Sequence, residues 1–503
     1  MKYASLRAAS GLLIGAALLL IGSCEKKQQV AGDILALVGD RVITGEDFMR
    51  RAEYTIRPNF CAGDNYIHRK IVLNSLIAEK LLALESPDSP LLRNPEFMSY
   101  IKGRQEQAMR QWLYKNVAMD QVQIDSTDLR SALRKSIRTY ELQFMNLPDS
   151  LTLQGWQHAQ ADGYGFDEVA RSLIVSDTIP SHELTWFERG DEVIHTLVFD
   201  NPHQKGDVLN PIALEDGGYL IVKIAGWVDR PIIAGGEYKQ HRLDVENRVF
   251  QQQADERYQS YVAGIMAGRE LELNKPIFMA YSKQAAGIYL RSQEEKEKLL
   301  NNAIWNSEEQ IYTESLAGGP EIPGEATLFN VDGEVWSVQR FEAELKVHPL
   351  VFRKRKMSNS EFPEQLKYAI ADFVRDSFLT RKAYDEGYDN VPNIRQHTEV
   401  WKDHYISRQT RNDYVRAQME ATQDSVQRSE IAALEIYMDP YIDALQSKYE
   451  DQIQINTDLF ETLKLSTVPM LVSTRNVPFT LAVPSFPRLT TDNKLNYGRR
   501  YEN

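Results

Sequence analysis

The sequence LALVGDRVITGEDF occupies residues 35–48, and a matching stretch, LFNVDGEVWSVQRF, occupies residues 328–341. In both copies, alternating apolar residues flank a Gly-Asp or Asp-Gly pair, which is typical of two short strands joined by a tight turn. Thr44 and Ser337 then stand where a hydroxyl can cap the start of a helix. A match in fixed order at this distance predicts that one module occurs twice.

Helical periodicity follows each hairpin. In the first copy the pattern predicts a helix with one apolar face, and it places Arg69, Lys70, Glu79 and Lys80 outside that face. The apolar residues of this face are Leu73, Leu76, Ile77, Leu81 and Leu84. In the second copy Ile370, Phe373, Val374, Phe378 and Leu379 match Leu73, Leu76, Ile77, Leu81 and Leu82 in the same register.

A second pair of matching stretches lies further along the chain, LELNKPIF at residues 271–278 and IQINTDLF at residues 453–460. More residues lie between the first hairpin and residues 271–278 than between the second hairpin and residues 453–460. The excess is close to the size of the domain between residues 136 and 230. The simplest interpretation is that the first module closes near Leu273 around an inserted domain, and that the second closes on itself near Ile455.

The N-terminus indicates export. Lys2 and Arg7 precede an apolar run at residues 11–20, which is too short to span a bilayer and suits a signal peptide. The stretch LIGSC at residues 20–24 resembles a bacterial lipobox, which implies lipidation of Cys24; a plain secretory signal is the alternative. Cys61 is then the only other cysteine, so no intramolecular disulfide is expected, and we predict a lone buried or half-buried thiol and no nucleophile.

Composition and motifs exclude several function classes. The chain has 503 residues and a formal net charge of -13, which argues against binding to nucleic acid. It contains no Gly-rich phosphate loop, no Gly-x-Ser-x-Gly and no His-Glu-x-x-His. His397 and His404 could share a helix face but have no carboxylate at ligand spacing, so no metal site and no cofactor are predicted.

Residues 136–230 form a small α+β unit by their pattern, and their motifs resemble a parvulin-type peptidyl-prolyl isomerase domain. The flanking module is similar to the chaperone domain of the exported foldases SurA and PrsA, which is likewise assembled from segments on both sides of an isomerase domain. The motifs that carry the parvulin resemblance are FDEVA at 166–170, WFERG at 186–190, VF at 198–199, GDV at 206–208 and GYLIVKI at 218–224.

The resemblance implies two active-site histidines, one in the first strand and one in the last. Here these positions fall on or next to Phe144 and on Leu220. The expected pocket therefore keeps its apolar character and loses its polar network, and His182 and His195 are interpreted as surface or loop residues. We predict a degenerate isomerase that still binds peptide; a rigid spacer is the alternative. The predicted cleft residues are Phe144, Trp186, Phe187, Phe199, Tyr219 and Leu220.

The expected protein is an envelope chaperone, lipid-anchored and facing the periplasm, that binds unfolded or proline-containing exported polypeptides without ATP. An active isomerase and a structural lipoprotein subunit are the alternatives. The predicted fold class is α+β, mainly helical. The predicted division is a signal peptide (1–24), a tether (25–32), a first module in two halves (33–135 and 231–280) around the parvulin-like domain (136–230), a helix and linker (281–325), a second module (326–463) and an extended tail (464–503).

Overall fold

The computed structural model describes residues 33–173, 178–188, 190, 192–214, 217–232, 235–292, 294–295, 315–318, 321–354, 356–423, 429–468 and 470–501. The predicted signal peptide, Cys24 and the tether lie outside the described residues, as do residues 296–314 of the predicted helix and linker. The described part is mainly helical with three small sheets, which confirms the predicted fold class. No described helix is both long and apolar enough to cross a membrane.

The first hairpin forms as predicted. Strands β1 (Ile34–Val38) and β2 (Arg41–Thr44) pair antiparallel around Gly39, whose φ of 62° permits the tight turn. Helix α1 (Gly45–Glu53) starts with a capping box, in which the Thr44 hydroxyl accepts a hydrogen bond from the Asp47 amide at 2.9 Å. Phe48 is fully buried on its inner face.

The second hairpin repeats this local structure. Strands β8 (Thr327–Val331) and β9 (Glu334–Ser337) turn at Asp332 and Gly333, both with positive φ. Ser337 caps α11 (Val338–Leu345) by accepting from the Arg340 amide at 3.2 Å. Phe341 is buried like its counterpart Phe48, so the predicted duplication of the hairpin and its helix holds in three dimensions.

The stretches predicted to close the two modules form strands, but each pairs with the hairpin of the other copy. Strand β7 (Leu271–Leu273) pairs with β8 of the second hairpin, and β10 (Ile453–Ile455) pairs with β1 of the first. The register is equivalent, because Leu271 lies opposite Val331 as Ile453 lies opposite Val38. The prediction that each module closes within its own copy is therefore wrong.

The chain order gives a physical reason for this exchange. The two closing strands have almost the same pattern, Leu-Glu-Leu and Ile-Gln-Ile, so side-chain fit does not select between them. Strand β7 is nearer along the chain to β8 than to β1, and the shorter loop costs less conformational entropy to close. Once β7 and β8 are paired, β10 is left for β1.

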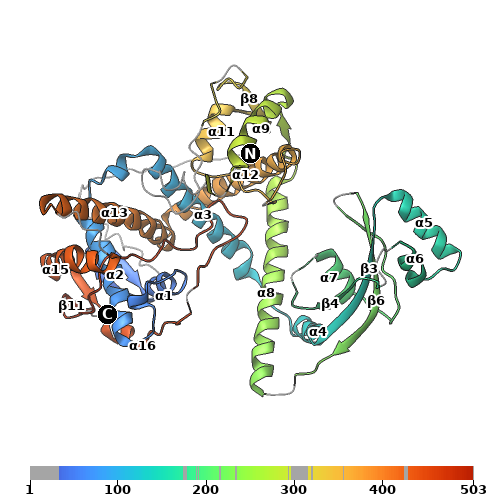
Figure 1. Ribbon diagram of the computed structural model, residues 1–503, viewed down its shortest axis with the longest axis horizontal. Helices are drawn as coiled ribbons and strands as arrows, with labels where there is room; N and C mark the ends of the chain where they lie inside the picture. Colours follow the sequence, from blue (N-terminus) through green and yellow to red (C-terminus); the bar gives the residue numbers. More distant parts are fainter. Residues whose placement is uncertain are drawn as a thin grey trace, which may run out of the picture.

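The result is a nested chain (Figure 1). The inner unit contains β7, α9 (Lys275–Tyr289), β8, β9, α11 and α12 (Phe362–Asp385). The outer unit joins both ends of the chain. Its elements are β1, β2, α1, α2 (Tyr66–Glu85), α3 (Pro95–Val117), α13 (Pro392–Ala421), α14 (Glu430–Ala433), a π-helical turn (Leu434–Met438), α15 (Asp439–Lys448), β10 and α16 (Thr457–Thr462).

Helix α2 is the centre of the outer unit, and α13 packs along both α2 and α3. The predicted apolar face is confirmed, since Leu73, Leu76, Ile77 and Leu81 are buried. Glu79 and Lys80, predicted to lie off the buried face, are buried as well. The reason is that α13 covers this second side of the helix and supplies polar partners for both residues, His404 for Glu79 and Asp403 for Lys80.

The inserted domain is connected to the rest of the chain through two helices, α4 (Ser126–Ser136) and the long α8 (Gly235–Met266). It lies away from the hairpin units (Figure 1). Its antiparallel sheet has the order β4-β3-β6-β5. The strands are β3 (Arg138–Leu147), β4 (Ser181–Thr185), β5 (Ile212–Ala213) and β6 (Tyr219–Asp229). One face carries α5 (Ser150–Ala161) and α6 (Phe166–Leu173), and the other carries α4, α7 (Glu192–Phe199) and part of α8.

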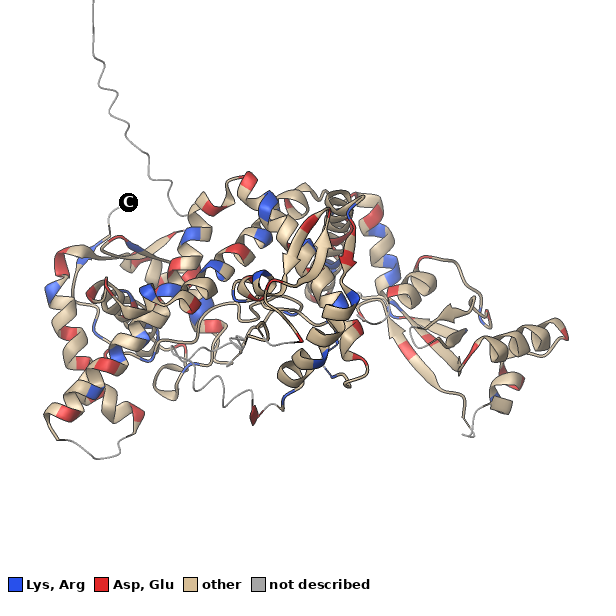
Figure 2. Ribbon diagram, turned by 90° about the horizontal axis from the view of Figure 1, so that it is seen from above, with Lys and Arg blue, Asp and Glu red and all other residues tan. Residues whose placement is uncertain are grey.

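The predicted extended tail is packed onto the outer unit, and we call residues 464–501 the strap. It has little regular structure: Ser473 bridges to Leu481, and β11 (Arg499–Arg500) adds a parallel strand beside β10. Five of its apolar side chains are nevertheless buried, namely Leu465, Phe479, Val483, Phe486 and Leu489. Acidic and basic residues are interspersed along the helices of the protein (Figure 2).

Candidate functional site

The predicted cleft residues of the inserted domain begin on the central strands of its sheet. Phe144 lies opposite Val222, and Leu220 lies opposite Asn146. Because directly opposite residues share a face, Phe144 and Leu220 point to the side covered by α4, α7 and α8. Trp186 and Phe199 pack in the cluster on this same side, so the structure brings these four residues to one face.

The other two predicted residues are placed differently. Tyr219 packs on the opposite face with Met145, Trp156 and Phe166, because neighbours in a strand point to opposite sides. Phe187 is exposed, and its ring stands edge-on to Trp186 and to His241 of α8, at 5.2 and 5.5 Å between centroids. Trp186 and Phe199 are buried core residues, so Phe187 is the accessible aromatic at this end.

Neither of the two candidate histidines replaces the polar network. The Nε2 of His182 lies 2.7 Å from a Glu188 carboxylate oxygen. The Nε2 of His195 lies 2.9 Å from the carbonyl oxygen of Trp186 and 3.1 Å from the Arg248 guanidinium. Burial, and then the charge of Arg248, lower the pKa of His195. Both rings are engaged by groups other than Phe144 and Leu220.

A polar cavity of about 650 Å³ lies beside Trp186 and His195, between α4, α7 and α8. Carboxylates outnumber the basic groups, Lys135 and Arg248, on its walls. The acidic residues are Asp128, Glu188, Glu192, Asp200, Asp255 and Glu256. Sequence reasoning missed this cavity because one wall is α8, whose packing against α4 and α7 no local pattern indicates.

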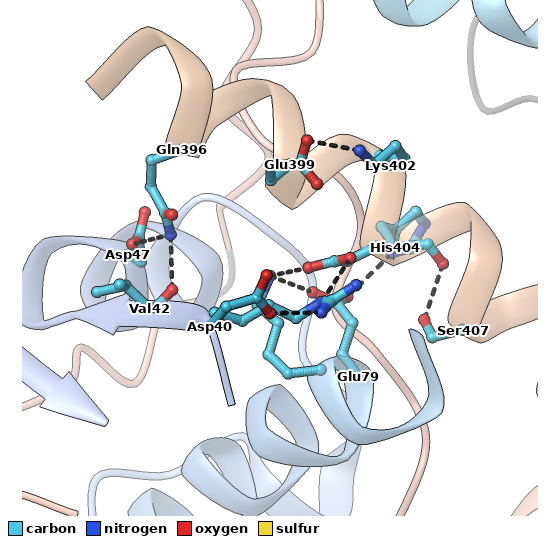
Figure 3. A network of polar contacts seen from close by, with 12 residues as sticks. Asp40, Val42, Asp47, Glu79, Gln396, Glu399, Lys402, His404 and Ser407 are labelled. Atoms are coloured by element: carbon cyan, nitrogen blue, oxygen red, sulfur yellow. Dashed lines mark hydrogen bonds and ion pairs between the residues drawn. The ribbon is translucent and has the colours of Figure 1, made fainter. Parts of the chain in front are cut away.

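The outer unit contains a buried ionic network (Figure 3). Asp403 of α13 binds Lys80 of α2 at 3.0 Å and Arg41 at 3.1 Å. Glu79 forms a two-point salt bridge with Arg51 at 2.8 and 2.9 Å and lies 3.4 Å from His404 Nδ1. Burial opposes ionisation of Glu79, but Arg51 and His404 hold the pKa of this carboxyl well below its usual range.

This network is structural. Glu79 and Asp403 have no exposed surface, so no substrate can reach either carboxylate. Their partners come from α1, β2 and α13, and the network thereby ties the first part of the chain to the last. Arrangements of this kind fix which segments pack together, since an unpaired buried charge would be costly.

The other sequence candidates for chemistry lead to no site. Cys61 is buried, and burial raises the pKa of its thiol to about 12, which makes it a poor nucleophile as predicted. Among the residues that the structure describes, no group of three or more His, Cys, Asp or Glu side chains is arranged to hold a metal ion.

His397 makes the stability of the outer unit depend on pH. It lines a small cavity beneath the strap with Arg50 and Pro484. Burial, then the charges of Arg104 and Arg50, lower its pKa to about 3. The unfolded chain binds a proton below about pH 6.5, so the stability is full above that pH and falls as pH drops toward 3.

From pH 7.5 to 5.5 we expect His397 alone to lower the free energy of unfolding by about 1.4 kcal/mol. Urea unfolding at both pH values measures this. The His397→Gln variant should lose that part of the pH dependence, and His158→Gln, at an exposed position on α5, should keep it. An unchanged slope in the first variant would show that His397 is not responsible.

No model of a known protein family matches the chain, and no curated protein matches it either.

Proposed function

We propose that this protein is a chaperone of the bacterial cell envelope that holds unfolded exported polypeptides. In this proposal the inserted domain binds peptide and does not catalyse prolyl isomerisation. Binding uses apolar contacts and main-chain hydrogen bonds, and needs neither ATP nor a cofactor. The proposal rests on the resemblance to exported foldases together with the chemistry of the inserted domain.

The observation that carries the proposal is the composition of one sheet face. Phe144 and Leu220 stand at the positions where the resemblance implies histidines, and they share their face with Trp186 and Phe199. Isomerisation must lower a barrier of about 18–20 kcal/mol, which requires polar groups placed to stabilise a twisted amide. An apolar face does not supply such groups, so it carries the non-catalytic assignment, and the client contacts are placed on exposed side chains of the same domain.

The architecture supports the same function. The inserted domain projects from α4 and α8, away from the two hairpin units (Figure 1), which leaves its outer surface accessible to a large partner. Exposed apolar side chains occur on this domain, among them Phe187 and Val193 near the cavity and Leu151 and Tyr164 near α5. A client could contact several such weak sites at once, which raises the overall affinity.

An aggregation assay and a refolding assay test this proposal together. The purified protein should suppress aggregation of an unfolded outer-membrane protein and leave the rate of a proline-limited refolding reaction within twofold of background. Phe187→Ala should weaken suppression, because it removes the accessible aromatic beside Trp186. Val335→Ala, at an exposed apolar position on β9 outside the inserted domain, is the control and should leave suppression unchanged. Strong acceleration of refolding would overturn the non-catalytic assignment, and absence of suppression would overturn the chaperone function.

Anchoring is tested separately. We expect the wild-type protein to incorporate radiolabelled fatty acid when expressed in bacteria and to sediment with membranes. Cys24→Ser should abolish labelling, because no thiol would then remain at the lipobox-like site. Cys61→Ser is the matched control and should remain labelled. Labelling that persists in Cys24→Ser would contradict a lipid anchor at this position.

A further inference from the structure

The strap is held by side chains that bind its main chain. Residues 479–494 cross the outer unit without a regular strand partner, yet their carbonyl groups are bound repeatedly by helical side chains. Arg104 donates to the Leu481 carbonyl at 2.8 Å, Arg51 to that of Ser485 at 2.9 Å, and Arg411 to that of Arg488 at 3.1 Å. Each of these donors lies on a different helix.

Two amide side chains make double contacts. The Gln107 amide donates to the Phe479 carbonyl at 2.8 Å and accepts from the Phe479 amide at 2.9 Å. This is the pair of hydrogen bonds that a neighbouring strand would make. Asn74 donates to the carbonyls of Asp492 and Lys494 at 2.7 and 2.8 Å. We call this set of side chains the strap groove: Arg51, Asn74, Arg104, Gln107 and Arg411.

The groove is suited to chains that contain proline. Pro484 and Pro487 lie in this part of the strap and Pro478 directly precedes it, and a proline cannot donate to a strand partner. Apart from the side-chain oxygens of Gln107 and Asn74, which accept from the Phe479 amide and the Tyr497 hydroxyl, the groove side chains donate to strap carbonyls, and every residue has a carbonyl. Such recognition depends on an extended backbone and little on the sequence that carries it.

The groove also binds one side chain of the strap, Phe479, in an aromatic pocket. Phe479 is 2% exposed, stands edge-on to Tyr100 with 5.3 Å between ring centroids, and lies 5.1 Å from the Arg104 guanidinium. Gly103 makes room for it, because a Cβ there would come within 2.7 Å of the Phe479 ring. Phe486 and Leu489 fill further apolar positions along the same path.

The fit of the strap is incomplete. The buried Nε of Arg51 and the buried indole Nε1 of Trp401, which lies in the cluster around Phe479, have no hydrogen-bond partner among the described residues. Unsatisfied buried donors are uncommon in a finished core and each costs free energy. A different extended segment could therefore compete with the strap without losing an optimised set of contacts.

We propose that the strap groove is a binding site for extended, proline-containing apolar polypeptide, and that the strap is its displaceable resident. Client segments of this chemistry would replace residues 479–494, so the strap regulates access to the groove. The proposal rests on the proposed chaperone function, and it adds a site on the outer unit that is separate from the inserted domain.

A labelled peptide with the sequence of residues 474–494 is the probe, and fluorescence anisotropy with the purified full chain is the measurement. The tethered strap competes at an effective concentration on the order of millimolar, so wild type should bind the peptide weakly. Phe479→Ala weakens the strap but leaves the groove intact, and should bind the peptide at least tenfold more tightly. Leu471→Ala, at an exposed strap position, is the control and should match wild type within twofold.

The groove itself is tested in the weakened background. Adding Gln107→Leu to Phe479→Ala should remove the gain, because the pair of main-chain hydrogen bonds is lost. The proposal is overturned if Phe479→Ala, folded by circular dichroism, gains no affinity, or if the double variant keeps the gain. A gain that persists would show non-specific binding to exposed apolar surface.

Amide hydrogen exchange on the wild-type protein tests displacement of the strap without needing any variant to fold. Excess unlabelled peptide should speed exchange of the strap amides and leave those of α2 unchanged; no change in the strap would make it a permanent part of the fold. The aggregation assay separates the two proposals. If the wild-type protein suppresses aggregation but the peptide does not displace the strap, the chaperone function is retained and only the strap-groove site is rejected.

Discussion

A fragment of residues 33–280 should fail to form the first hairpin unit, although it contains everything that the repeat pattern places in one module. It lacks β10, the strand beside β1, and α13, which covers α2. Without α13 the buried Glu79 and Lys80 lose His404 and Asp403. Limited proteolysis should cut within α1 and α2 and spare the inserted domain.

Two other fragments provide the controls. Residues 265–390 contain β7 together with β8 and β9, and should unfold cooperatively on their own in urea. Residues 33–117 joined by a short flexible linker to residues 392–501 should restore a protected α2. If the 33–280 fragment resists protease as well as this joined fragment does, the strand exchange is not what holds the outer unit together.

Local features of the fold follow from the sequence, because short-range physics determines them. The turns need residues that tolerate positive φ, and Gly39 and Gly333 supply them; the caps need hydroxyls, and Thr44 and Ser337 supply those. The choice of third strand is different. Leu271–Leu273 and Ile453–Ile455 have similar patterns, so the local sequence does not indicate that the first joins β8 and the second joins β1.

The sequence likewise predicts some features of the candidate sites and not others. Alternation along β6 already requires Tyr219 and Leu220 to face opposite sides, so the split of the predicted cleft could have been foreseen. The cavity beside His195 could not, because its far wall is α8. The strap has no periodicity, and its binding side chains come from four helices that precede it by long stretches of sequence.

The Asp403→Ala variant should lose about 3–5 kcal/mol of unfolding free energy, since the buried Lys80 ammonium loses its hydrogen-bonded carboxylate and keeps only Glu79, which is 3.8 Å away and already paired with Arg51. Asp403 has no exposed surface and binds Lys80 at 3.0 Å and Arg41 at 3.1 Å. Urea unfolding of the full chain, followed by circular dichroism, measures the loss. The matched control on the same helix is Glu399→Ala, whose partially exposed pair with Lys402 should contribute under about 1 kcal/mol (Figure 3).

A double variant separates the charge from the packing. Replacing Lys80 by Met together with Asp403 by Leu removes both buried charges and keeps apolar volume between α2 and α13, so most of the lost stability should return. If Asp403→Ala costs no more than Glu399→Ala, the network does not hold the two ends of the chain together. If the double variant is as unstable as Asp403→Ala, the loss comes from packing around α13, and the unpaired ammonium is not its cause.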